Sequence, residues 1–300
     1  MTVMTVYNHA MRPSLLVPML LLAGASIAHA QTTEISSPNA LGMGGAFRAL
    51  AYDNSAIDLN PAGTAQVKRF SFQGAYYRTA LDREYAMQVS VVDSLTNTAA
   101  TGFAIEYRKV RPGRLPGEEG FESQKYMTSV GVPLVPQKVA FGFNTKYIRV
   151  NHSNALPARR DESIITGDFG VLYRPFQMLA VGATFDNLID GGHRAAPRGF
   201  TGGAAFLPAP WVTVSADVFV DMASTEKDET GWAVGAQLMP HRNFSLRAGA
   251  YEDALTKTRI WTAGLGLNAE TGTIDYACRF EEEKTNKILT HYISFSFFVF

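Results

Sequence analysis

The chain has 300 residues, 27 basic and 27 acidic side chains, and therefore a formal net charge of zero. Balanced charge argues against nucleic acid as a partner, because that binding depends on an excess of Lys and Arg that neutralises phosphates. The single cysteine, Cys278, excludes an internal disulfide. Glycine and aromatic residues are both frequent, which favours a β-rich chain with many tight turns over a helical one.

The N-terminus has the pattern of a secretory signal. Met11 and Arg12 form a weakly positive start, residues 15–27 are apolar, and Ala28-His29-Ala30 offers small residues around a cleavage site. The apolar stretch is shorter than the roughly 20 residues that a membrane-spanning helix needs. We therefore predict a signal peptide over residues 1–30, cleaved after Ala30, with either Met1 or Met11 as the true start.

From Phe70 onward, large apolar residues alternate with small or polar ones. The stretch 102–108, Gly-Phe-Ala-Ile-Glu-Tyr-Arg, shows this period of two. We count about fourteen such runs up to Phe300, each close to the roughly 9–11 residues that a tilted strand needs to cross a bilayer. The pattern predicts an all-β, antiparallel, up-and-down transmembrane barrel over residues 69–300.

The predicted connections alternate between short and long, apart from a short first hairpin at 78–83. Outer-membrane barrels have short turns on the periplasmic side and longer loops outside, whereas a soluble sandwich has no reason to separate loop lengths in this way. The short turns fall at 93–98, 133–138, 174–176, 208–210, 240–243 and 269–272, and the longer polar loops at 111–124, 151–162, 189–198, 222–230, 252–258 and 281–287.

The two faces of the predicted strands differ in character. One is rich in Phe, Tyr, Val, Ile and Leu, and the other carries small residues and scattered charges. Alternation alone does not say which face points inward, but a membrane barrel places the small and polar face toward the lumen. The lumenal charges are then Glu106, Arg108, Lys146, Asp168, Asp186, Asp217, Arg247, Asp275 and Arg279.

These lumenal charges allow two interpretations. Buried charges are nearly always paired, so the favoured one is that Glu106 or Asp275 pairs with Arg108, Arg247 or Arg279 across a water-poor lumen. The other is a polar track for a solute. Part of the set is also a candidate anchor for whatever fills the lumen.

The last eight residues alternate aromatic and small side chains and end on Phe300. This ending resembles the recognition signal that the outer-membrane barrel assembly machinery reads, with Phe298 and Phe300 as its aromatic residues. An ordinary buried terminal strand is the alternative. Together with the export signal, the ending favours the outer membrane of a bacterial cell, with membrane lipid and the assembly machinery as partners.

No motif indicates an enzyme, a cofactor or a metal. Residues 42–46 resemble a dinucleotide-binding turn but lack a preceding strand and a βαβ unit. Asp168-Phe169-Gly170 matches a kinase tripeptide without its catalytic partners, and the six His are dispersed. Cys278 is predicted to face lipid. An outer-membrane enzyme assembled from distant strands stays as a third hypothesis with no nominated nucleophile.

Three short stretches carry a family resemblance: Ser-Ser-Pro-Asn-Ala-Leu-Gly-Met-Gly-Gly-Ala-Phe at 36–47, Ala-Tyr-Asp-Asn-Ser-Ala at 51–56, and Asn-Pro-Ala-Gly at 60–63. Together they resemble the N-terminal segment of the FadL-type long-chain fatty acid transporter superfamily, and most closely its PorV-like and uncharacterised outer-membrane branches. The resemblance implies that residues 31–68 fold back as a hatch that plugs a fourteen-stranded barrel. The hatch residues it nominates are Gly42, Gly44, Gly45, Phe47, Asn60, Pro61, Ala62 and Gly63.

In the transporter branch, hydrophobic molecules leave sideways through a gap beside a kinked third strand, and Gly102 is the candidate for that kink here. Within the hatch, Asp53 or Asn54 is expected to cap a short helix that Pro61 ends. The glycines permit the chain to pass close to a wall.

The sequence thus predicts a passive uptake channel for small hydrophobic molecules. The chain is shorter than the transporters and has no long helix-patterned loop outside. The alternative is therefore a PorV-like structural or secretion barrel that binds other envelope proteins and transports no solute.

Overall fold

The structure, a computed structural model, describes residues 37–79, 84–111, 120–153, 161–189, 195–225, 227–283 and 286–300. The predicted signal peptide and both candidate start codons lie outside these residues. The described chain contains two short α-helices, one 3-10 helix and fourteen strands. These elements are α1 (Pro38–Gly42), α2 (Ala56–Leu59), η1 (Pro61–Ala65), β1 (Phe70–Thr79), β2 (Glu84–Asp93), β3 (Ala100–Val110), β4 (Gly120–Val135), β5 (Val139–Ser153), β6 (Glu162–Phe176), β7 (Leu179–Asp186), β8 (Gly199–Ala209), β9 (Val212–Asp221), β10 (Glu229–His241), β11 (Phe244–Glu252), β12 (Arg259–Ala269), β13 (Gly272–Glu283) and β14 (Asn286–Val299).

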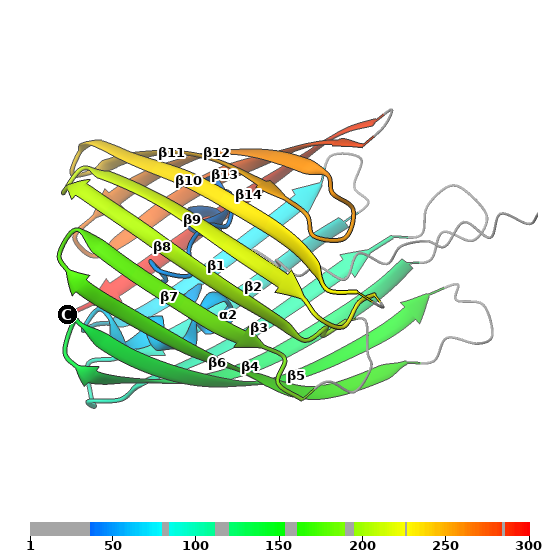
Figure 1. Cartoon of the computed structure of the whole chain (residues 1–300), viewed down its shortest axis with the longest axis horizontal. Coiled ribbons are helices and arrows are strands. Elements are labelled where there is room, and N and C mark those ends of the chain that lie inside the picture. Colours follow the sequence, from blue (N-terminus) through cyan, green and yellow to red (C-terminus); the bar gives the residue numbers. More distant parts are fainter. Residues whose placement is uncertain are drawn as a thin grey trace, which may run out of the picture.

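The strands form one closed antiparallel barrel in which each strand pairs with its neighbours in the chain (Figure 1). The barrel closes where β1 pairs with β14, from Phe70 opposite Val299 to Thr79 opposite Thr290. The predicted all-β up-and-down architecture is confirmed. In Figure 1 the C-terminus lies at the left end, with the turns that were predicted to be short.

Some strands are longer than the alternation indicated. β4 begins at Gly120, β5 reaches Ser153, and β13 and β14 continue to Glu283 and Asn286, where a loop over 281–287 was predicted. The reason is that polar residues pair in a ladder as well as apolar ones do once a strand leaves the hydrocarbon region. Polarity alone therefore placed these boundaries too early.

The outward face of the barrel is apolar. Phe72, Phe103, Phe143, Val218 and Phe295 are 44–55 % exposed on strands spread around the circumference. An apolar surface of this extent is unsuited to water and matches the lipid-facing band of a membrane barrel. Cys278 lies on this face, in line with the exposed Tyr276 and Phe280.

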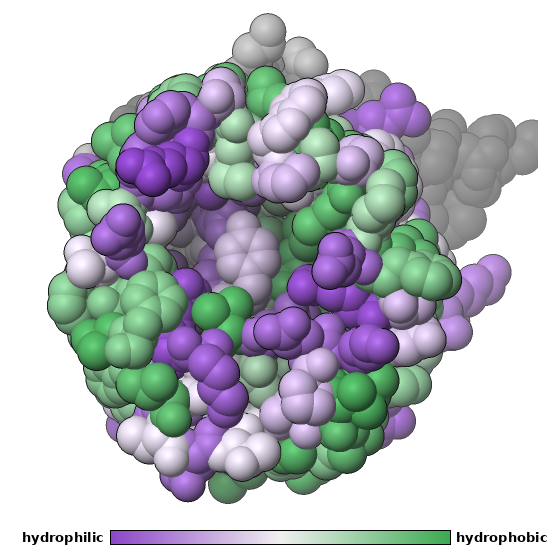
Figure 2. Space-filling model, turned by 90° about the vertical axis from the view of Figure 1, so that its left-hand side faces the viewer, coloured by the Kyte–Doolittle hydropathy of each residue, from purple (hydrophilic) through white to green (hydrophobic). Residues whose placement is uncertain are grey.

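A segment of residues 37–69, here called the lumenal segment, lies inside the barrel. Almost every residue from Ser37 to Ala65 is buried, α1 contacts β11 to β14, and η1 contacts β3 to β6. In Figure 1 the segment, with α2 labelled, occupies the half of the barrel that carries the short turns. Seen from that end, the barrel is hollowed at its centre, with hydrophilic residues in and around the hollow (Figure 2). None of the helices in the described ranges could cross a bilayer by length and hydropathy.

Candidate functional site: the lumenal segment and its polar pocket

The lumenal segment touches the wall where glycines face inward. Gly131, Gly142 and Gly170 are cross-strand neighbours on β4, β5 and β6. A Cβ added to Gly142 would overlap the backbone of Pro61 and Ala62, and one on either neighbour would overlap atoms of residues 60–64. The wall and η1 are therefore in direct backbone contact, with no space for a side chain between them.

A second glycine row faces the start of the segment. Gly235 and Gly249 are paired on β10 and β11, and an added Cβ on either would overlap the backbone of residues 43–44. Gly264 on β12 approaches the predicted hatch residue Gly42, because an added Cβ would lie 3.1 Å from its Cα. Two further glycines of the sequence prediction lie in the turn after α1, with φ angles of +64° and +79° that favour glycine: Gly44 and Gly45.

Asn60 and Asp217 hold the middle of the segment. Asp217 on β9 accepts the backbone N–H groups of Phe47 and Arg48, each at 3.0 Å. Asn60 donates from Nδ2 to the carbonyl of Arg48 at 2.9 Å and to that of Val171 on β6 at 3.1 Å. Because Asn60 bonds both to another part of the segment and to the wall, it fixes the two parts relative to each other.

The remaining predicted hatch residues are buried beside Asn60. The ring of Phe47 is fully buried and lies 5.2 Å from that of Tyr52. Pro61 and Ala62 open η1 against the wall. Gly63 faces the carbonyl of Ala51 so closely that it has no space for a side chain.

The expected helix cap differs in detail. Ser55 takes the N-cap position of α2, and Asp53 accepts its backbone N–H at 2.9 Å. The side chain of Asn54 instead donates to Ser90 on β2. The helix ends at Leu59, ahead of Pro61, as predicted.

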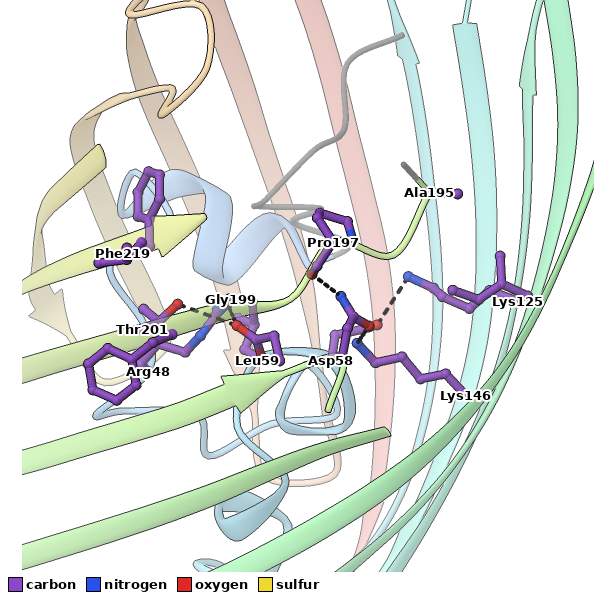
Figure 3. Close-up of a pocket in the computed structure, with 15 residues that line it drawn as sticks. Arg48, Asp58, Leu59, Lys125, Lys146, Ala195, Pro197, Gly199, Thr201 and Phe219 are labelled. Carbon is purple, nitrogen blue, oxygen red and sulfur yellow. Dashed lines mark hydrogen bonds and ion pairs between the residues drawn. The ribbon is translucent and has the colours of Figure 1, made fainter. Parts of the chain in front are cut away.

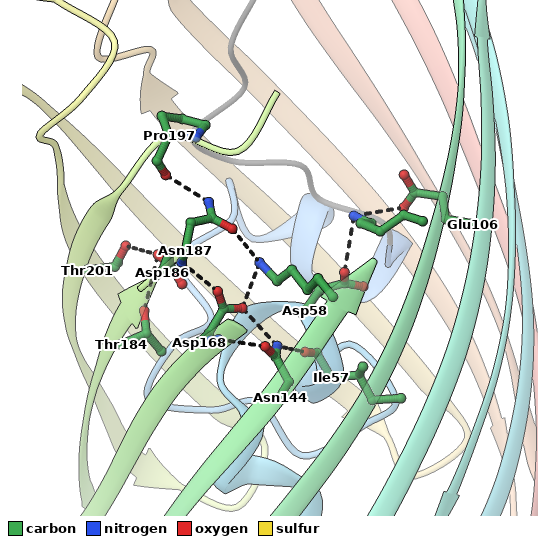
Figure 4. A network of polar contacts seen from close by, with 12 residues as sticks. Ile57, Asp58, Glu106, Asn144, Asp168, Thr184, Asp186, Asn187, Pro197 and Thr201 are labelled. Carbon is green, nitrogen blue, oxygen red and sulfur yellow. Dashed lines mark hydrogen bonds and ion pairs between the residues drawn. The ribbon is translucent and has the colours of Figure 1, made fainter. Parts of the chain in front are cut away.

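A polar network joins α2 to the wall through Asp168, which is fully buried on β6 (Figure 4). Its carboxylate accepts a bond from Lys146 Nζ at 2.7 Å, from Asn144 Nδ2 at 2.8 Å and from the backbone N–H of Asn187 at 2.8 Å. Asn144 also donates to the carbonyl of Ile57 in α2 at 2.8 Å. One carboxylate thus orders β5, β6 and the end of β7 around the lumenal segment.

Two more ion pairs join the segment to the wall. Asp58 lies 3.4 Å from Lys125 Nζ on β4, which lies 3.3 Å from Glu106 on β3. Arg48 lies 3.8 Å from Asp186 on β7 and donates from Nε to Thr184 at 3.3 Å. These contacts surround the segment with charges of both signs.

These charged residues enclose a pocket on the side of the segment away from the short turns (Figure 3). Its volume is about 70 Å³. An apolar cavity of roughly 150 Å³ accommodates benzene, so this pocket is too small and too polar for an aromatic solute in the present conformation. Its lining includes Arg48, Asp58, Lys125, Lys146, Asp186, Asn187, Pro197 and Phe200.

The nine predicted lumenal charges all face inward, and eight of them form ion pairs with a described partner; Asp217 instead binds the backbone N–H groups noted above. Arg247 lies 2.7 Å from Asp275 and also donates to Gln237, which is a pairing that the sequence proposed. The other partners were missed. Glu84 lies at a strand end, Lys125 just ahead of a predicted strand and Glu281 in a predicted loop, whereas Arg48 and Asp58 belong to the non-periodic segment. The remaining pairs are Arg108 with Glu84 and Arg279 with Glu281.

Strand pairing is unbroken at Gly102, the candidate kink. β3 pairs with β2 and with β4 in continuous register through this residue, with no register shift. A Cβ at Gly102 would lie 2.9 Å from Cγ1 of Ile57 in α2. The glycine therefore gives space to the lumenal segment, and the wall beside it is closed.

The two terminal phenylalanines have different environments. Phe298 faces inward and is 8 % exposed, with the guanidinium of Arg69 4.0 Å above its ring centre. Phe300 is 69 % exposed at the barrel end. Arg69 also donates to the carbonyl of Tyr52 at 3.1 Å, so it links the C-terminal strand to the end of the lumenal segment.

Charges that are paired and buried in this way hold a structure together. Across the described part of the chain, no three His, Cys, Asp or Glu side chains are grouped as metal ligands. The site is thus that of a membrane barrel whose lumen holds residues 37–69 of its own chain.

Solved structures of transporters share this fold. The toluene transporter TbuX of Ralstonia pickettii superposes with a TM-score of 0.69 at 13 % identity, over 87 % of this chain and 97 % of that one. The toluene transporter TodX of P. putida gives 0.67 at 13 % identity, over 86 % and 97 %. The chain thus has the fold of these two toluene transporters. No protein-family model and no curated protein matches the sequence.

Proposed function

We propose that the protein is an outer-membrane uptake channel for small hydrophobic molecules, in which residues 31–68 act as a hatch within the barrel of residues 69–300. One observation carries the proposal: the lumenal segment lies within the lumen, at the end with the short turns, of a barrel that has the fold of two toluene transporters. A segment that only stabilised the barrel would not need a charged pocket on its side away from the short turns. A segment that moves must break its contacts with the wall, and the ion pairs of Asp58 and Arg48 can be replaced by contacts with water.

In this proposal the hatch moves before a solute passes. The pocket of about 70 Å³ is smaller than an aromatic solute requires. The residues that line it belong both to the segment and to the wall, so a shift of the segment enlarges it. The paired charges would be released together, because Asp58, Lys125 and Glu106 form one chain of contacts.

We expect the uptake of a labelled hydrophobic solute into liposomes to depend on the segment. Wild-type protein should exceed empty liposomes, and a deletion of residues 42–63 should pass hydrophilic dyes as well, because the lumen is then unfilled. Heat-dependent gel mobility, which reports a folded barrel, controls for misfolding of the deletion. If the labelled hydrophobic solute entered liposomes with wild-type protein, liposomes with the deletion variant and empty liposomes equally fast, the proposed channel function would be contradicted.

We propose that the hydrophobic solute leaves the lumen for the membrane between β6 and β7, and not beside Gly102 on β3. β6 pairs with β5 from Glu162 onward, but its described ladder with β7 begins at Phe169, extended by one backbone bond from Leu188 N–H to the carbonyl of Gly167 at 2.8 Å. Asp186 and Asn187, at the end of β7, line the pocket on this side. The pocket therefore adjoins the part of the wall where β6 has the fewest ladder partners among the described residues.

A photoreactive side chain in place of Ile165 on β6 should capture a hydrophobic solute during uptake, because Ile165 is exposed at this seam. The same group in place of Ile105 on β3 is the matched control, since it too faces lipid but beside a continuous ladder. Capture of the solute at Ile105 and not at Ile165 would indicate that the solute leaves beside β3, the third strand.

A second function is supported by a separate observation. The two glycine rows pack the segment directly against the wall, and the wall beside Gly102 is closed. A static barrel that binds other envelope proteins, as in the PorV-like alternative, would need only such a fixed filler. Crosslinking in cells separates the two functions: recovery of only assembly machinery and lipid would count against this alternative.

A further inference from the structure

A groove on the outer surface of the barrel lies across the closure strands β1, β13 and β14. Its volume is about 420 Å³, and its lining includes Tyr76, Arg78, Tyr276, His291 and Ile293. We call it the closure groove. It is separate from the lumenal pocket, because Tyr76, Tyr276 and Ile293 are exposed on the lipid-facing side.

The groove combines positive charge with an apolar membrane surface. The outward positions of β1 begin at Phe70 and Phe72, at the end with the short turns, and reach Arg78 near the other end. A tilted strand crosses the hydrocarbon core in about 9–11 residues. Arg78 is the ninth residue of β1, so it lies at the outer edge of the apolar band, at the level of lipid headgroups.

Several polar groups meet at this level. Arg78 is directly opposite His291 in the ladder that closes the barrel. His291 Nδ1 lies 2.7 Å from the hydroxyl of Tyr276. Arg78 already has an interaction within the chain, but a guanidinium carries five N–H donors, which suits it to bind phosphate as well. A basic side chain is tolerated on a lipid-facing surface near the headgroups, where anionic groups are available.

Below this polar group the surface leaves room for an acyl chain. Gly74 occupies an outward position between Phe72 and Tyr76, and a Cβ added there would meet no atom within 4 Å. The flanking outward residues, Phe72 and Phe295, are apolar and exposed. The surface thus leaves open space at Gly74, two residues from Tyr76 in the groove and flanked by apolar side chains.

We propose that the closure groove binds a phosphate-bearing lipid of the outer leaflet. The headgroup phosphate is held by Arg78, with His291 and Tyr276 beside it, and an acyl chain lies along Gly74. The bound lipid bridges β1 to β13 and β14, and so covers the seam where the first and last strands of the barrel meet. This site is independent of solute uptake.

The test uses the full chain and two lipids that differ only in phosphate: phosphatidic acid and diacylglycerol with the same acyl chains. Native mass spectrometry after delipidation in mild detergent should show retention of phosphatidic acid over diacylglycerol. Arg78→Gln should lower that retention about tenfold, as expected for loss of a charge-assisted bond to phosphate. His291→Gln should have a smaller effect in the same direction.

Arg149→Gln is the matched control, because Arg149 is also exposed at an outward position, on β5 away from the closure groove. Gly74→Phe fills the proposed acyl channel and should lower retention of both lipids. Heat-dependent gel mobility confirms that each variant is folded. Equal loss in Arg78→Gln and Arg149→Gln, or equal retention of the two lipids by wild type, would overturn the proposal.

Discussion

Replacing Gly142 with leucine is expected to displace the lumenal segment from the wall. The new side chain would occupy the place of the Pro61–Ala62 backbone. The wall cannot yield locally, because Gly131 and Gly170 on either side contact the same segment. Overpacking of this kind costs about 1–3 kcal/mol, which corresponds to a shift of roughly 5- to 150-fold in the equilibrium between seated and displaced segment.

The displacement can be measured as the rate of dye entry into liposomes and as protease cleavage within residues 60–66. Gly74→Leu is the matched control, since that position faces outward and an added Cβ would meet nothing within 4 Å. Gly142→Ala should give a smaller effect in the same direction. If Gly142→Leu leaves a folded barrel with unchanged dye entry and protection, the close contact with η1 does not keep the lumen closed.

Replacing Lys146 with methionine is expected to destabilise the barrel markedly. Asp168 is fully buried and would lose the cation that lies 2.7 Å away. Breaking a buried ion pair by removing one partner costs about 3–5 kcal/mol, because an uncompensated charge stays buried. The amide of Asn144 and the backbone N–H of Asn187 still bind the carboxylate, so we expect the lower end of that range.

Urea unfolding of the folded barrel in lipid vesicles measures this effect. The double variant Lys146→Met with Asp168→Asn should recover most of the loss, because no buried charge is then unpaired. Lys109→Met is the control: Lys109 also forms an ion pair, with Glu122, but both side chains are more than a third exposed, and its removal should leave stability unchanged. If Lys146→Met and Lys109→Met lowered the free energy of unfolding by similar amounts, burial would not determine how much each ion pair contributes to stability.

The two experiments address different links between hatch and barrel. The glycine contacts set where the segment lies, through steric exclusion that does not depend on salt or pH. The ion pairs of Asp58, Lys125 and Arg48 contribute to the free energy needed to displace the segment. Their strength falls when water enters the lumen around them, because the dielectric constant rises. A channel requires charged contacts that break and re-form, whereas a static barrel requires only the glycine contacts.

Alternation in the sequence was sufficient to indicate the fourteen strands and to divide their side chains into two faces, and the export pattern and loop lengths then assigned the apolar face to lipid. The period of two is a local property of an extended chain, so it can be read without knowing which strands pair. The same holds for the helix that ends before Pro61, because the restriction acts on the preceding residue alone.

Only the tertiary structure decided what meets inside the lumen. Gly131, Gly142 and Gly170 lie on three successive strands, and they form one row because strand register brings them opposite one another. A search for glycines at inward positions would have nominated them, but not their common contact with η1. Arg48 and Asp58 were missed for the same reason: their partners, Asp186 on β7 and Lys125 on β4, reach the segment only when the barrel closes around it. Local patterns determine the direction of a side chain, whereas closure of the barrel around the segment determines which side chains face each other.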